Sequence, residues 1–106
     1  MILVHKILAE TAGTFAMVFA GYGTLLLSEK YPHAVPAFCV PLVFGLVITG
    51  MIFAFGHVSG AHFNPAVTLA FAAAKRLPLN QIFIYWGSQF LGGLAAIGLL
   101  SVLQNK

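Results

Sequence analysis

The chain consists of long apolar stretches that are separated by very few charged residues. The charged side chains are Lys6, Glu10, Glu29, Lys30, Lys75, Arg76 and Lys106. An uninterrupted apolar run of about 20 residues is long enough to cross the hydrocarbon core of a bilayer as a helix. The pattern therefore predicts three spanning helices, over residues 7–27, 38–55 and 79–103.

The stretch from residue 57 to residue 75 does not fit a fourth span. It begins with polar and helix-breaking residues and then becomes apolar. As a helix, residues 64–75 would be about 18 Å long, roughly half a bilayer. Two interpretations remain open: a surface loop with an interfacial helix, or a re-entrant loop that returns as a half-helix. Irregular backbone is tolerated deep in a membrane only when it is buried in protein or lines a wet cavity, so the second interpretation implies a pore.

The sequence Asn64-Pro65-Ala66 is the predicted start of that short helix. Asparagine is a strong N-cap residue, and proline is preferred at the first helical position. Any helix can begin this way. At the membrane midplane, however, Asn64 can cap the helix with its oxygen and direct its NH2 group into a lumen. The positive end of the half-helix would then repel cations and orient the oxygen atom of a water molecule.

Composition narrows the possible functions. Hydrophobic residues make up 60% of the chain and charged residues 7%, whereas about 25% are charged in ordinary soluble domains. Lipid must therefore cover most of the surface. The net charge of +3 includes no basic cluster larger than Lys75-Arg76, which argues against nucleic acid as a partner. The single cysteine, Cys39, excludes an intrachain disulfide and a cysteine metal cluster.

Neither a cofactor nor catalysis is predicted. His57 and His62 lack the further ligands that a metal site needs, and no activated nucleophile or acid–base pair is recognisable.

Small residues at every fourth position predict close helix packing in lipid. These positions are Ala12, Ala16 and Ala20 in the first helix and Ser88, Gly92 and Ala96 in the third.

The string of residues 57–68, HVSGAHFNPAVT, closely resembles the first NPA loop of the aquaporin (major intrinsic protein) family. Residues 9–15 and 44–46 resemble the first two helices of that family, and Gln89 followed by Gly92-Gly93 resembles the third. The resemblance implies an all-α membrane protein with three transmembrane helices, a re-entrant loop and a half-helix. Residues 1–106 would form one half-length repeat, in a multi-pass protein of the plasma membrane.

The resemblance also implies residue roles. The pore-lining residues would be Gly60, Ala61, His62, Phe63, Asn64, Pro65 and Ala66, with backbone carbonyl groups of the first four forming a ladder of acceptors for water. The loop would be braced by Glu10, His57 and Gln89. The selectivity constriction would include Phe44, Ile52 and Val67, and both Phe44 and His57 favour water over glycerol. Val67 follows the NPA motif, whereas in the family an arginine follows the second NPA motif.

The predicted function is passive water conduction through a pore made by two antiparallel copies. Family subunits contain two such repeats, and an odd number of spans makes the second repeat inverted. Four such pores would contain eight chains. Opposite insertion is compatible with a weak charge bias, in which Lys6 and Lys75-Arg76 would lie opposite Lys30 and Lys106. The alternatives are a truncated half that modulates full-length relatives, a channel for glycerol or ammonia, and a non-functional remnant.

Overall fold

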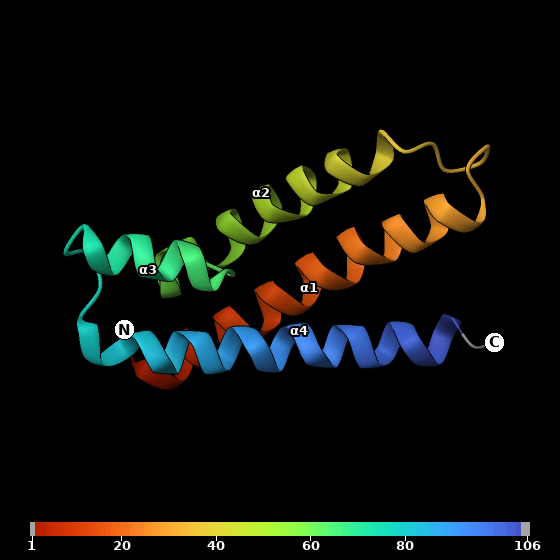
Figure 1. The fold of residues 1–106 in the computed structure, drawn as a ribbon. Helices are drawn as coiled ribbons and strands as arrows, with labels where there is room; N and C mark the ends of the chain where they lie inside the picture. Colours follow the sequence, from red (N-terminus) through yellow and green to blue (C-terminus); the bar gives the residue numbers. More distant parts are fainter. Residues whose placement is uncertain (1, 105–106) are drawn as a thin grey trace.

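The computed structural model describes residues 2–104, and that part of the chain is helical, without strands (Figure 1). The helices are α1 (Leu3–Lys30), α2 (Cys39–Ser59), α3 (Pro65–Ala73), the 3-10 turn η1 (Leu79–Gln81) and α4 (Ile82–Gln104). Three of the helical stretches, Leu3–Lys30, Cys39–Ser59 and Leu79–Gln104, are long and apolar enough to cross a membrane. The predicted fold class is therefore confirmed.

The first two spanning helices are longer than the predicted ranges. α1 begins at Leu3 rather than at residue 7, and it continues to Lys30 through polar residues that suit the membrane interface. α2 continues to Ser59 rather than ending at residue 55. Gly60 ends α2 because its φ of 89° is left-handed, a conformation that glycine adopts without steric cost. Met1, Asn105 and Lys106 lie outside the described residues. The predicted position of the Lys106 charge on one side of the membrane therefore has no structural counterpart here.

α1 is the central helix, with α2 packed on one side and α4 on another (Figure 1). The contact with α4 is tight at Gly92, where an added Cβ atom would lie 2.3 Å from the Thr11 carbonyl oxygen. Gly92 is buried together with Ser88 and Ala96, which confirms the predicted stripe of small residues on α4.

The predicted stripe of Ala12, Ala16 and Ala20 on α1 is wrong at its first position, because Ala12 is exposed. The buried small residues of α1 include Gly13 and Gly21 instead. These glycines lie against the phenyl rings of Phe63 and Phe44, which are within 2.6 Å of where their Cβ atoms would be. The packed surface of α1 therefore differs from the predicted stripe, because Gly13 and Gly21 receive aromatic rings and the α4 backbone approaches α1 at Thr11 and Phe15.

α3 is a half-length helix that returns toward the end of the molecule from which α1 starts. After Ser59 the chain turns back toward the middle of the bundle, and α3 then runs outward beside the first turns of α4 (Figure 1). Its nine residues span about 14 Å, whereas the molecule extends 46 Å along its longest axis. Of the two interpretations of residues 57–75, the re-entrant one is therefore correct.

Candidate functional site

The carboxylate of Glu10 organises the connection between α2 and α3. Its side chain is fully buried. Oε2 accepts hydrogen bonds from Ser59 Oγ (2.6 Å) and the His62 backbone N–H (3.0 Å). Oε1 accepts from the Phe63 backbone N–H (2.8 Å) and Gln89 Nε2 (2.8 Å). Four donors satisfy an ionised carboxylate, so this buried charge holds the connection to both α1 and α4.

The connection has a backbone conformation that needs such support. Gly60, Ala61 and Phe63 have φ angles of 89°, 56° and 54°. The left-handed region costs a non-glycine residue roughly 1–2 kcal/mol, and such residues persist when surrounding contacts fix them. Besides its bond to Glu10, Phe63 has a ring that packs directly against Gly13 and is only 2% exposed. These contacts therefore fix residues 60–63 in a backbone conformation that the segment would not keep by itself.

The carbonyl groups of this segment are free acceptors. Within residues 2–104, none of the carbonyl oxygens of residues 60–63 accepts a hydrogen bond, although neighbouring carbonyls on both sides do. The flanking Ser59 carbonyl accepts from the Tyr85 hydroxyl at 2.6 Å, and the Pro65 carbonyl accepts from Trp86 Nε1 at 3.0 Å. The row of unused acceptors therefore has defined ends, both fixed to α4.

His62 and Phe63 contribute backbone rather than side chain to any lumen. The imidazole ring of His62 is buried and stacks on Phe71, with ring centroids 4.3 Å apart. Its Nδ1 lies 2.8 Å from Thr68 Oγ1, which also accepts a hydrogen bond from Gln89 Nε2 at 2.9 Å. Glu10, Gln89 and Thr68 thus form one polar network beneath the segment, and His62 joins it from the segment itself.

Asn64 caps α3 and leaves half of its amide group free. Its Oδ1 accepts a hydrogen bond from the Ala66 N–H at 2.8 Å, and Pro65 follows it in the first turn. The Asn64 side chain is exposed, and its Nδ2 donates no hydrogen bond within residues 2–104. A donor and the positive end of a helix therefore lie at the surface, next to the row of carbonyl acceptors.

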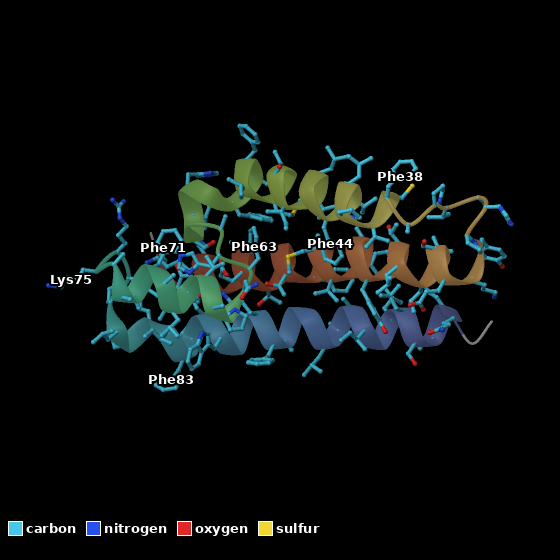
Figure 2. The ribbon with its side chains drawn as sticks, turned by 45° about the horizontal axis from the view of Figure 1, so that its top comes forward. Phe38, Phe44, Phe63, Phe71, Lys75 and Phe83 are labelled. Atoms are coloured by element: carbon cyan, nitrogen blue, oxygen red, sulfur yellow. The ribbon has the colours of Figure 1, made fainter. Side chains whose placement is uncertain are left out.

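The other predicted site residues differ in their surroundings. Phe44 lies between α2 and α1, on Gly21 and farther than Phe63 from the α3 end (Figure 2). Ile52 and Val67 are exposed, at 48% and 36%. His57 was predicted in the loop, but α2 continues past it, and its exposed side chain makes no hydrogen bond within residues 2–104. The predicted bracing contact of His57 is therefore absent from this part of the chain.

Sequence reasoning missed several residues that support the segment. They are Ser59, Thr68, Tyr85 and Trp86. Two signals could have indicated them. Thr68 ends the string of residues that resembles the NPA loop, and Tyr85 lies one helical turn before Gln89, so both side chains share one face of α4.

We expect Thr68→Val to destabilise the protein by about 1–3 kcal/mol, because it leaves His62 and Gln89 with one fewer buried partner each. Valine keeps the shape of threonine, so the loss reports the hydroxyl group. Thr49→Val is the matched control, since Thr49 is exposed and bonds only to the Gly45 carbonyl of its own helix. Unfolding in mixed micelles, followed by the fluorescence of the single Trp86, measures both. Equal losses in the two variants would contradict the network.

Comparisons with known proteins all indicate the same protein family. The sequence profile of the family described as Major intrinsic protein matches residues 1–106. The chain is 46% identical over 100 residues to Aquaporin NIP3-1 of Arabidopsis thaliana, covering 94% of this chain and 31% of that protein. It is 42% identical over 99 residues to Nodulin-26 of Glycine max, covering 93% and 36%.

A bacterial relative is similar over a larger share of its length. Aquaporin Z of Brucella melitensis biotype 1 is 42% identical over 104 residues, covering 97% of this chain and 46% of that protein. The chain thus spans between about a third and just under a half of these three relatives. By its matching profile, its relatives and its helices, the chain belongs to the major intrinsic protein family.

Proposed function

We propose that this chain forms a passive water channel in the plasma membrane, in which two antiparallel copies make one pore. The observation that supports the proposal most directly is the row of free carbonyl oxygens at residues 60–63, which ends beside the exposed amide of Asn64. The similar proteins named above include aquaporins, which agrees with a channel rather than an enzyme.

Water would cross this segment by exchanging hydrogen-bond partners. The carbonyl oxygens of residues 60–63 accept hydrogen bonds from the water hydrogens, so a molecule leaving one site meets the next acceptor. At the end of the row, Asn64 Nδ2 and the positive end of α3 orient the water oxygen toward themselves. The same positive end opposes cations. The lining residues Pro65 and Ala66 offer no charge at this point.

The second half of the pore is assigned to a second copy because α3 reaches along only one half of the molecule. Three spans put the ends of one copy on opposite sides of the membrane, so an inverted copy restores the symmetry of two facing half-helices. Phe44 of one copy would form the constriction with Ile52, Ala61 and Val67 of the other. That ring is apolar. Four such pores could then cluster.

Osmotic shrinkage of proteoliposomes that contain only this chain tests the proposal. We expect fast shrinkage with a shallow temperature dependence, and we expect Asn64→Leu to lower it to the rate of empty vesicles while assembly is retained. The matched variant is Asn64→Asp, because aspartate keeps the N-cap acceptor and removes the NH2 donor. Loss of flux in both variants would identify the donor. Wild-type flux in Asn64→Leu would exclude this pore assignment.

The same vesicles separate the alternative cargoes and roles. Val67 gives the constriction neither a charge nor a hydrogen-bond donor from its side chain, which favours ammonia and other small neutral solutes as additional cargo. Glycerol and ammonia gradients measure them directly. Shrinkage no faster than that of empty vesicles, with folded protein confirmed, would favour a half that modulates full-length relatives, or a remnant.

A further inference from the structure

We propose that an apolar groove between the C-terminal halves of α1 and α4 is the docking surface for α3 of a second copy. The proposal rests on the antiparallel pore proposed above, and it names the surface and the segment that would make the pair. The groove has a volume of about 440 Å³. Among the residues that line it are Phe19, Gly23, Leu27, Tyr31, Leu100 and Leu103.

The groove continues the faces of α1 and α4 that hold the re-entrant segment. On α1, Gly13 supports the ring of Phe63, and the groove residues Ala20 and Thr24 lie about two and three helical turns further along on the same face. On α4, Leu100 lies about three turns beyond Gln89. One half of this shared surface therefore carries the chain's own segment, and the other half is open.

The open half is where an inverted copy would place its own α3. In an antiparallel pair the second copy is inverted, so its α3 lies in the opposite half of the membrane. It therefore lies at the depth at which the first copy has the groove. Figure 1 shows α1 and α4 diverging toward their C-terminal ends, the region that lines the groove. α3 is about 14 Å long, which is about half the thickness of a bilayer core.

α3 has an exposed apolar face. Its outward residues Ala66, Leu69, Ala70 and Ala73 are exposed. They recur at the spacing of one helical stripe. Leu69, 54% exposed, is the single large side chain among alanines. Small residues let a helix backbone approach closely in lipid, so this stripe suits insertion of Leu69 between α1 and α4 of the other copy.

The charges at the two ends agree with this placement. Glu29 is the exposed acid of the chain and lies at the groove end of α1, next to Lys30 at the mouth of the groove. Lys75 and Arg76 follow α3 at the opposite end, where Figure 2 shows Lys75. Antiparallel pairing brings this basic pair to the membrane face that carries Glu29. It also brings the carbonyl end of the partner's α3, which favours a cation, toward Lys30.

Cysteine cross-linking in vesicles tests the docking. In a Cys39→Ser background, we expect Leu69→Cys combined with Leu103→Cys to give a covalent dimer on mild oxidation. The control pair combines Leu69→Cys with Gly98→Cys, because Gly98 lies on α4 with open space around it. This control should cross-link much less. The two test positions lie in opposite halves of one chain, so a disulfide between them reports a contact between copies.

Filling the groove provides a second measurement. A side chain at Gly23 would start 3.2 Å from Leu100 Cδ2, inside the groove, so Gly23→Leu should reduce dimer formation, whereas Gly98→Leu should not. Cross-linking absent from vesicles in which the wild type conducts water would overturn the groove assignment and leave the proposed pore intact. Cross-linking without water flux would support docking and remove the proposed function. A monomer whose groove is occupied by a spin-labelled lipid chain would overturn the inference.

Discussion

Glu10→Gln should lower the free energy of unfolding by about 2–6 kcal/mol and abolish the proposed water flux. Glutamine replaces one carboxylate oxygen with an NH2 group, so two of the four buried donors lose their acceptor and face another donor, at about 1–3 kcal/mol each. The backbone N–H groups of His62 and Phe63 are among these donors. The connection would then lose the contacts that hold its left-handed residues.

Glu29→Gln is the matched control, because Glu10 and Glu29 are the two acids of the chain. Glu29 is exposed at the end of α1, where its replacement should change stability by less than about 0.5 kcal/mol. Unfolding in mixed micelles reports both variants through Trp86, whose indole bonds to the first residue of α3. A Glu10→Gln protein as stable as the control would show that the carboxylate does not hold the connection.

Gly92→Leu should destabilise the protein by about 3 kcal/mol, near the upper end of the usual cost of overpacking. Its Cβ atom would lie 2.3 Å from the Thr11 carbonyl oxygen and 3.1 Å from the Phe15 backbone nitrogen, and backbone atoms cannot turn away as a side chain can. α1 and α4 would have to separate. Gln89, one turn earlier on α4, would then lose its reach to Glu10, so the proposed water flux should fall as well.

The control for this variant is Gly98→Leu on the same helix. Nothing lies within 4 Å of the position that its Cβ atom would take. Leucine also favours a helix more than glycine does, so this variant should be unchanged or more stable by up to about 1 kcal/mol. The same micelle unfolding measures both. Similar losses at the two positions would mean that close approach at Gly92 does not determine the packing of α4 on α1.

Local signals in the sequence were sufficient for much of the fold and part of the site. Apolar run lengths predicted three spans, and the Asn-Pro pair predicted the start of α3, where the structure has an Asn cap and a first-turn proline. The family resemblance, rather than a local pattern, implied that Glu10 and Gln89 brace the loop. The structure places both in contact with each other.

Other features differ from the prediction, one of them for a local reason and the rest because of tertiary contacts. His57 looked like part of the loop because polar residues surround it, yet the chain stays helical until Gly60 provides a left-handed residue. The packed face of α1 was misplaced because alanine spacing alone does not reveal that Gly13 and Gly21 receive aromatic rings from residues far along the chain. The roles of Tyr85 and Trp86 depend on α3 lying against α4.

The buried carboxylate has a consequence for how the protein is made. The hydrogen-bond partners of Glu10 are 49 to 79 residues further along the chain. Ribosomes synthesise α1 first, so this helix must enter the bilayer before Gln89 exists to meet it, and an acidic residue well inside a helix costs up to about 2.5–3.5 kcal/mol at insertion. α2 has a mean hydropathy of 2.2 over 18 residues. It contains no acidic residue, so its insertion does not carry this cost. Insertion of α1 is therefore the step at which biogenesis of this protein is most sensitive to the translocation machinery.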